Sequence, residues 1–246
     1  MYPILFKIGP ITIYAYGTML AIAFIVGLYL ARYEFRRHKI NPDYAYDFVL
    51  AIALGGIIGA RLFYIIGHWA YYSRHLGEII QVQQGGLVFY GGLLGGFLGA
   101  FLVVRLRKLS LLKIADSLAS PLALGTVIGR LGCFLNGCCY GLPTKLPWGV
   151  KFFDVPRHPT QIYELIHSLA IFFFLFLYVE KKIKLRSDGS LFLIYLLLYS
   201  FGRFWLEFLR DSPHVLRYFT FSQLASLVIF IVAGYLFFQR LRLKRV

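Results

Sequence analysis

The stretch YDFVLAIALGGIIGARLFYIIG occupies residues 46–67, and only Asp47 and Arg61 in it carry a charge. Because about 20 mostly apolar residues are enough for a helix to cross the hydrocarbon core of a bilayer, this stretch predicts a transmembrane helix. Six further stretches share its character: residues 13–31, 86–104, 112–133, 161–179, 190–209 and 221–238. We therefore expect an all-α, polytopic integral membrane protein with about seven transmembrane helices.

The composition excludes a water-soluble protein. Hydrophobic residues make up 59% of the chain and charged residues only 15%, whereas about 25% of residues are charged in a soluble domain. The net charge of +15 comes from short basic clusters between the apolar stretches. Clusters in that position attract anionic membrane lipids, so membrane lipids and no nucleic acid are the expected partners.

A single membrane domain over residues 1–246 is the simplest organisation, with the outer-face segments 68–85 and 134–160 forming a small extramembrane part. The first apolar stretch has no basic segment before it and no small-residue cleavage site after it, so it predicts a span rather than a removable signal peptide. Glycines lie on or near one face of the span at 86–104, a pattern that lets helices approach closely. They are Gly91, Gly92, Gly95, Gly96 and Gly99.

The basic residues also predict the orientation, because cytoplasmic connections carry an excess of Lys and Arg. One side has 16 of them: Arg32, Arg36, Arg37, Lys39, Arg105, Arg107, Lys108, Lys113, Lys181, Lys182, Lys184, Arg186, Arg240, Arg242, Lys244 and Arg245. The other side has seven: Lys7, Arg74, Lys145, Lys151, Arg157, Arg210 and Arg217. We expect the N-terminus outside and the C-terminus in the cytoplasm.

Six charged residues lie further inside the predicted spans than Asp47 and Lys113, which stand at span ends, and they are costly to bury and therefore functional candidates. This topology places five of them in the outer half of the membrane: Arg61, Arg130, Glu164, Arg203 and Glu207. Asp116, near an inner end, is the exception. The shared depth predicts a polar cavity open to the outer leaflet. Because guanidinium groups bind phosphate in a bidentate manner, its expected occupant is an anionic phospholipid headgroup.

Arg203, Glu207 and Arg210 are spaced by four and then three residues, which places them on one helix face. One interpretation is an ion pair within the helix that neutralises Arg203. The other is that Glu207 orients Arg203 toward a phosphate. The two interpretations are compatible, and the sequence leaves both open.

Three motifs carry a family resemblance: GRLGCFLNGCCYG at residues 129–141, HPTQIYE at 158–164 and GRFWLEFLR at 202–210. Further matches are Tyr16-Gly17, Gly59-Ala60-Arg61 and GGLVFYGG at 85–92. In this order the motifs resemble the bacterial prolipoprotein diacylglyceryl transferases. The resemblance runs from about residue 8 to 239, which is nearly the whole chain.

The resemblance implies a multi-pass enzyme of the bacterial cytoplasmic (inner) membrane whose active site faces the outer leaflet. It implies transfer of the diacylglyceryl group of phosphatidylglycerol to the thiol of the lipobox cysteine in a prolipoprotein. It also implies that Arg130 and Arg203 bind and stabilise the departing phosphate, and that Tyr16, Asn136, Glu207 and Gly141 complete the site, with Arg210 nearby. Together with the other residues considered, the catalytic candidates are Arg130, Arg203, Tyr90 and Glu207, and the substrate-binding candidates are Tyr16, Arg61, Asn136, Gly141, His158, Glu164 and Arg210.

Three positions differ from the commonest family pattern: Tyr90 stands for a histidine proposed as the base, Cys133 for an asparagine and Cys138 for a glutamate. A tyrosine with a pKa near 10 is a poor general base. His158 is a candidate to replace the histidine. The departures motivate one alternative, a divergent member that acts on another phospholipid or acceptor. A lipid-binding or transport protein without chemistry is a second, separate alternative.

The three cysteines, Cys133, Cys138 and Cys139, lie within seven residues. A zinc site would need four ligands, of which His158 is a candidate, but the cysteines lack C-x-x-C spacing and face a membrane cavity, so no metal is expected. No cofactor is expected either. A disulfide that involves Cys133 and a covalent lipid–cysteine intermediate stay open, and plain buried thiols are the simplest interpretation.

Overall fold

The computed structural model describes residues 2–9, 11–81, 85–179, 188–216 and 219–242. Several basic residues counted for the orientation lie outside these ranges: Lys181, Lys182, Lys184, Arg186, Arg217, Lys244 and Arg245. The orientation of the termini stays a prediction.

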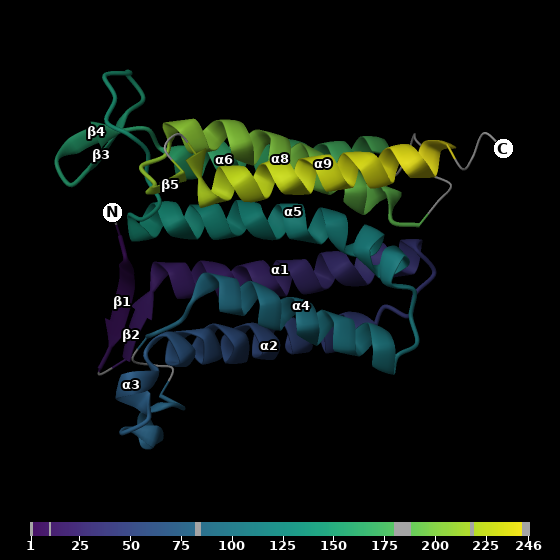
Figure 1. Ribbon diagram of the computed structural model, residues 1–246, viewed down its shortest axis with the longest axis horizontal. Helices are drawn as coiled ribbons and strands as arrows, with labels where there is room; N and C mark the ends of the chain where they lie inside the picture. Colours follow the sequence, from purple (N-terminus) through teal and green to yellow (C-terminus); the bar gives the residue numbers. More distant parts are fainter. Residues whose placement is uncertain (1, 10, 82–84, 180–187, 217–218, 243–246) are drawn as a thin grey trace. The chain divides into compact units, whose positions relative to one another are not determined.

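Seven helices of the described chain are long and apolar enough to cross a membrane, which confirms the all-α, polytopic prediction (Figure 1). They are α1 (Ala15–Arg37), α2 (Tyr44–Gly67), α4 (Phe89–Leu106), α5 (Leu111–Asn136), α6 (Thr160–Phe173), α8 (Ser190–Leu206) and α9 (Phe221–Arg242). The π-helical η3 (Phe174–Val179) continues α6, and the 3-10 helix η4 (Glu207–Leu209) continues α8.

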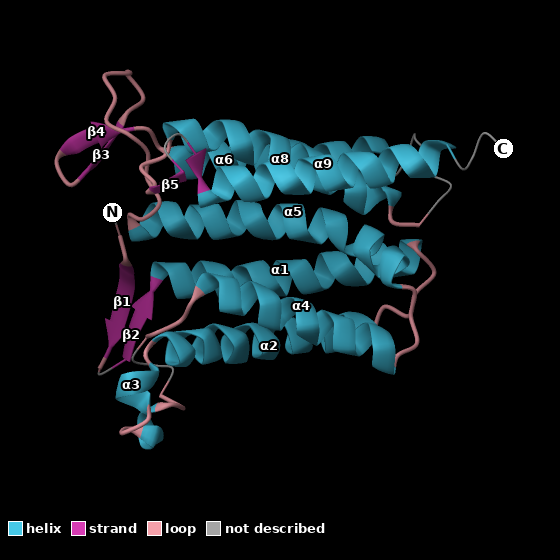
Figure 2. Cartoon of the chain, in the orientation of Figure 1, coloured by secondary structure: helices cyan, strands magenta, loops and turns pink. Residues whose placement is uncertain are grey.

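Short elements connect the spans (Figure 2). Residues 68–85 contain α3 (Trp69–Tyr72) and the 3-10 helix η1 (Leu76–Glu78), and residues 134–160 contain the hairpin of β3 (Val150–Phe152) and β4 (Val155–Arg157). Two further antiparallel hairpins are β1 (Ile4–Ile8) with β2 (Ile11–Tyr14), and β5 (His214–Leu216) with β6 (Phe219–Thr220), and none of the three hairpins was predicted. Strands of two to five residues leave no clear periodicity in a sequence.

The chain forms two compact units, of which the first comprises residues 1–30 and 115–246 and the second residues 31–114. The first unit holds most of α1 and α5 together with α6, α8 and α9. The three hairpins of its described residues lead into or out of the same end of these helices, at the left of Figure 1, and α9 ends at the opposite end. That these units act as a single membrane domain stays a prediction.

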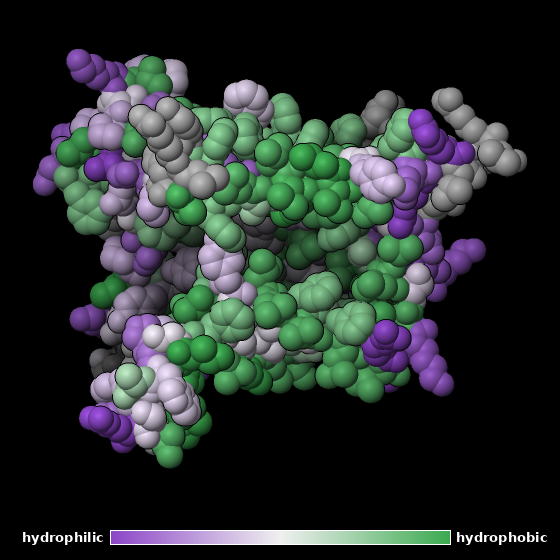
Figure 3. Space-filling model, in the orientation of Figure 1, coloured by the Kyte–Doolittle hydropathy of each residue, from purple (hydrophilic) through white to green (hydrophobic). Residues whose placement is uncertain are grey.

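Apolar side chains cover the outside of the helices and polar ones lie inside. Leu54, Ile58 and Phe97 are among many large apolar residues that are about half exposed, whereas Gln161 and Thr160 are fully buried. In Figure 3 the hydrophobic side chains cover the middle of the helices and the hydrophilic ones gather at their ends. This distribution suits lipid as the solvent, because lipid gives no reason to hide apolar side chains.

In the second unit, α2 and α4 pack through glycines, as the glycine-rich face predicted. A Cβ atom on Gly95 would overlap the carbonyl oxygen of Gly55, and one on Gly91 would overlap that of Gly59. Gly99 stands in the same relation to Ala51. The two backbones are therefore in direct contact, which only residues without a side chain allow.

Asp116, the one buried charge that was predicted near an inner end of a span, has a structural role in the first unit. Its two carboxylate oxygens accept hydrogen bonds from the backbone N–H groups of Gly189, at 2.5 Å, and Phe192, at 2.8 Å. These are N–H groups of the first turn of α8, which have no partner within the helix. A carboxylate at this position also interacts favourably with the helix dipole.

Candidate functional site

Five charged residues of the first unit form a buried ionic network, hereafter the arginine–glutamate cluster: Arg130, Glu164, Arg203, Glu207 and Arg210. Glu164 on α6 is its centre. One of its oxygens lies 2.6 Å from Arg203 on α8 and 3.5 Å from Arg210, and the other lies 2.5 Å from Arg130 on α5. The cluster therefore joins three helices that are distant in sequence.

The cluster is deeply buried and carries an excess of positive charge. The side chains of Glu164 and Glu207 are 5% and 1% exposed, and the most exposed arginine, Arg130, is 17% exposed. Three guanidinium groups and two carboxylates leave one positive charge uncompensated. Because isolated buried charge is strongly unfavourable, such an arrangement is typical of a site that receives an anion.

Glu207 pairs with Arg203 at 2.8 Å, one helical turn away, and lies 4.0 Å from Arg210. Both sequence interpretations of this helix face are therefore compatible with the geometry: the pair within the helix exists, and Arg203 also contacts Glu164 on another helix. The start of α9 supports the network, since Thr220 Oγ1 donates to Glu207 Oε1 at 3.1 Å and Arg203 donates to Ser222 Oγ at 3.3 Å.

Thr220 and Ser222 were missed by sequence reasoning, although the sequence carries a signal for them. Thr220-Phe221-Ser222-Gln223 has the Thr-x-x-Gln spacing of a capping box. In the structure, Thr220 N–H donates to Gln223 Oε1 at 2.9 Å, and Gln223 N–H donates to Thr220 Oγ1 at 3.3 Å. The box fixes the start of α9 against the arginine–glutamate cluster.

Gly141 lies where the chain between α5 and α6 meets η4, with its N–H bonded to the carbonyl of His158 at 2.9 Å. A Cβ atom there would overlap the carbonyl oxygen of Leu209 and lie 2.8 Å from Thr160 Cγ2. His158 itself contacts the hydroxyl of Tyr163 at 3.3 Å. Gly141 and His158 are thus neighbours at the edge of the site, and close packing explains the glycine.

The end of α5 forms a Schellman motif that brings cysteines together. Gly137 has a φ of +72°, its N–H bonds to Phe134 O at 3.1 Å, and Cys138 N–H bonds to Cys133 O at 3.1 Å. Asn136, the last helical residue, hydrogen-bonds to Cys138. The three sulfur atoms of Cys133, Cys138 and Cys139, hereafter the thiol cluster, lie within 4.8 Å of one another.

The thiol cluster lies within electrostatic reach of the arginines. Hydrogen bonds within the cluster lower the pKa of Cys139 below that of an ordinary thiol, and the charges of Arg210 and Arg130 lower it further. Tyr16 on α1 interacts electrostatically with all three cysteines and with Arg130, and its ring packs over Gly132. Tyr16 therefore lies near both clusters.

The two remaining candidates, Arg61 and Tyr90, belong to the second unit. Arg61 donates to the carbonyl oxygens of Glu78 at 2.6 Å, Ile79 at 2.8 Å and Gly85 at 2.8 Å. Each nitrogen atom of its guanidinium group therefore donates to a main-chain carbonyl group. Its guanidinium group holds a loop, and substrate binding by Arg61 stays a prediction. Tyr90 lies in the first turn of α4 and is 51% exposed. Its catalytic role also stays a prediction.

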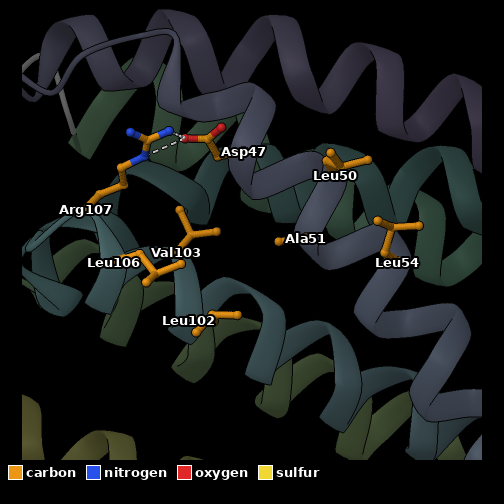
Figure 4. A pocket seen from close by; sticks show the side chains of 8 residues that line it. All are labelled: Asp47, Leu50, Ala51, Leu54, Leu102, Val103, Leu106 and Arg107. Atoms are coloured by element: carbon orange, nitrogen blue, oxygen red, sulfur yellow. Dashed lines mark hydrogen bonds and ion pairs between the residues drawn. The ribbon is translucent and has the colours of Figure 1, made fainter.

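Each unit has a cavity. The one in the first unit has a volume of about 210 Å³ and is lined by Glu207, Arg210, Thr220 and Gln223 among others, so it borders the arginine–glutamate cluster. The one in the second unit, about 410 Å³, is lined mainly by apolar residues of α2 and α4 (Figure 4). Asp47 and Arg107 form an ion pair of 2.7 Å at one end of it. It contains no predicted site residue.

These features define a multi-pass membrane protein with a buried, positively charged site in its first unit. The model of the family described as prolipoprotein diacylglyceryl transferase matches residues 3–239. The chain belongs to this family.

Relatives agree with the family assignment. A phosphatidylglycerol–prolipoprotein diacylglyceryl transferase of Trichormus variabilis is 36% identical over 242 residues, which cover 92% of this chain and 84% of the relative. Proteins of the same name from Clostridium tetani and Clostridioides difficile are 35% and 34% identical. The aligned part covers 96% of this chain and 97% of the relative for the first, and 91% and 89% for the second.

Proposed function

We propose that this chain transfers the diacylglyceryl group of phosphatidylglycerol to a cysteine thiol in the lipobox of a prolipoprotein and releases glycerol phosphate. The observation that carries the proposal is the arginine–glutamate cluster, with its uncompensated positive charge. The name of the family and the names of its relatives state the same activity.

The phosphate would bind to Arg130 and Arg203. Within the described part of the chain, Arg130 makes its ion pair through Nη2, so its other nitrogens are available for a phosphate. Guanidinium groups suit this role because their parallel N–H donors match two phosphate oxygens. Glu164 touches both arginines and would hold them in position.

The headgroup glycerol would bind to the carboxylates. Glu164 Oε2 and Glu207 Oε2 are buried, and neither accepts a hydrogen bond within the described residues, although each lies in an ion pair. A carboxylate oxygen can accept more than one hydrogen bond, so the hydroxyl groups of a glycerol headgroup would donate to these oxygens in addition to the arginines. The cavity lined by Glu207 and Arg210 would accommodate the glycerol part of the headgroup.

The reaction is a nucleophilic displacement. The thiolate of the acceptor attacks the glycerol carbon that bears the phosphate, a C–S bond forms, and the C–O bond to the phosphate breaks. Negative charge builds up on the departing phosphate oxygen, where Arg130 and Arg203 stabilise it. Preorganised donors of this type each contribute about 10²–10³ to kcat.

The location follows from the same proposal. The loops that carry the basic clusters would face the cytoplasm, because cytoplasmic connections carry an excess of Lys and Arg. The end of the first unit that carries the arginine–glutamate cluster would then face the outer leaflet of the bacterial inner membrane. Phosphatidylglycerol then reaches the site from that leaflet, and the signal segment of the prolipoprotein from the outer face.

The test uses purified protein in detergent micelles with a cysteine-containing lipobox peptide. Micelles that contain phosphatidylglycerol should give two products in equal molar amounts: glycerol phosphate, and peptide whose mass has increased by one diacylglyceryl group. Micelles with zwitterionic phosphatidylethanolamine are the control and should give neither. Phospholipid consumption without peptide modification would instead support a different acceptor, which is the alternative that Tyr90, Cys133 and Cys138 motivate. A folded protein that gives neither product in either lipid would contradict the transferase proposal.

A further inference from the structure

The three cysteines of the chain are its only ones, and the fold collects all three at one point. Their sulfur atoms lie within 4.8 Å of one another, and all three are free thiols. The sequence expectation of plain thiols without a metal rested on the missing C-x-x-C spacing. The turn at Gly137 supplies the proximity that this spacing normally provides.

The backbone that carries the thiols is firmly held. Gln161 Nε2 donates to Cys138 O at 2.6 Å, and Thr160 Oγ1 donates to Cys139 O at 2.8 Å. Both of these side chains are fully buried at the start of α6. Gln161 lies three residues before Glu164 in α6, so the two bonds hold the thiol cluster near the centre of the arginine–glutamate cluster. Ligands held by such outer contacts are typical of metal sites.

We propose that Cys133, Cys138 and Cys139 bind one zinc ion through three thiolates. A tetrahedral zinc ion with Zn–S bonds of about 2.3 Å places its sulfur ligands about 3.8 Å apart. Side-chain rotations that move the sulfur atoms by about 1 Å would bring the three thiols to this spacing. Thiolates select zinc and copper(I) among the common metals, and zinc does not change its redox state.

The geometry leaves the fourth ligand position to a substrate. Among the described residues, no further His, Asp, Glu or Cys groups with the three sulfur atoms. Zinc sites with three protein ligands and one exchangeable ligand are the catalytic kind, whereas structural sites are closed by four. Arg130 and Arg210 interact electrostatically with Cys139 and would offset the negative charge of a tris-thiolate zinc complex.

This inference rests on the proposed function and supplies its missing step, activation of the acceptor. The acceptor cysteine binds zinc at the fourth position and its S–H proton passes to water. The zinc-bound thiolate then donates an electron pair to the glycerol carbon, a C–S bond forms, and the electrons of the C–O bond leave with the phosphate. The product is a neutral thioether, a weaker zinc ligand that dissociates. No basic side chain at the position of Tyr90 is then required.

Metal content tests the site without any assay of activity. Purified protein, reduced and treated with a chelator, should take up one zinc ion per chain and, with cobalt(II) instead, develop a thiolate-to-cobalt charge-transfer band. The chain contains no other cysteine from which this band could arise. Cys133→Ser and Cys139→Ser should lose the band, whereas His158→Ala, which removes an alternative ligand, should keep it. Wild-type protein that takes up no zinc under these reducing conditions would overturn the proposal.

The acceptor role is tested separately on the cobalt(II)-loaded protein. A lipobox peptide with cysteine should alter the charge-transfer band, and the same peptide with serine should not. Metal-free protein that transfers the diacylglyceryl group at the full rate would refute the zinc proposal and leave the transferase proposal intact. A band that responds to the cysteine peptide, in protein that never releases glycerol phosphate, would support the metal site and contradict the transferase proposal.

Discussion

Glu164 and Arg203 form an ion pair of 2.6 Å between α6 and α8, and the second oxygen of the same carboxylate lies 2.5 Å from Arg130 on α5. One buried carboxylate thus positions two guanidinium groups from different helices. Its removal would take from Arg130 its ion pair with Glu164 and would leave Arg203 paired with Glu207 but not with Glu164.

We therefore expect Glu164→Gln to destabilise the protein strongly. Removing one partner of a buried ion pair costs about 3–5 kcal/mol, because the remaining charge stays buried. The thermal midpoint of the purified protein should fall by several degrees. The matched control is Asp43→Asn, which removes an exposed partner of Arg32 at 3.2 Å and should change stability by about 1 kcal/mol or less. Equal midpoints for the two variants would mean that Glu164 does not hold the cluster.

A second prediction concerns Gly141. In Gly141→Ala the new methyl group would collide with Leu209 O and the side chain of His158, so we expect a loss of about 1–3 kcal/mol from overpacking and reduced transfer activity. Gly129→Ala serves as the control because nothing lies within 4 Å of a Cβ atom there. Thermal unfolding of both variants checks this. Gly141→Ala protein as stable as Gly129→Ala would show that the loop can move aside.

The third prediction separates a loop-holding role of Arg61 from substrate binding. In Arg61→Lys, the lysine side chain ends in a single nitrogen atom, whereas three nitrogen atoms of Arg61 donate to the carbonyl groups of Glu78, Ile79 and Gly85. The variant therefore cannot make all three hydrogen bonds. The loop that contains these residues should become more sensitive to protease, and the phosphatidylglycerol dependence of the rate should change little. Arg74→Lys, at an exposed position, is the control. A raised KM for phosphatidylglycerol with an unaltered protease pattern would assign Arg61 to the substrate instead.

Tyr90→Phe tests the fourth prediction, that the phenol is not the base. If zinc activates the acceptor thiol, this variant should retain its activity, because it loses only a hydroxyl group on a half-exposed ring. Loss of a true general base lowers rates by about 10²–10⁴. A fall of that size in glycerol phosphate release, with the thermal midpoint preserved, would make Tyr90 the base.

Hydropathy predicted the seven spans because the length of an apolar run is set by bilayer thickness. It did not locate every end. The first span was predicted to stop at residue 31, but α1 continues to Arg37, since helix formation does not require apolar side chains. The backbone contact of Gly55 and Gly95 was predicted in kind from the glycine-rich face.

The site was predicted in part. The predicted depth of each residue along its span grouped Arg130, Glu164 and Arg203, and these three residues do form ion pairs in the structure. Depth does not fix the position of a residue in the plane of the membrane. The sequence therefore grouped Arg61 with these residues, whereas the hydrogen bonds of Arg61 are made to Glu78 and Ile79 in the second unit. Which carboxylate meets which arginine depends on helix rotation and packing, and these could not be derived from one sequence. The thiol cluster depended on the turn at Gly137, which residue spacing alone did not reveal.

The most direct test of the central claim is the rate of glycerol phosphate release by Arg203→Lys, measured as kcat and KM in phosphatidylglycerol micelles. Lysine keeps the charge but cannot contact Glu164, Glu207 and a phosphate at once as the planar guanidinium group can. We expect kcat to fall by about 10²–10³, as for loss of a donor to developing negative charge, with a smaller change in KM. Arg107→Lys, whose ion pair with Asp47 lies in the second unit, should match the wild-type protein. Wild-type kcat from folded Arg203→Lys protein would contradict the claim that this cluster stabilises the departing phosphate.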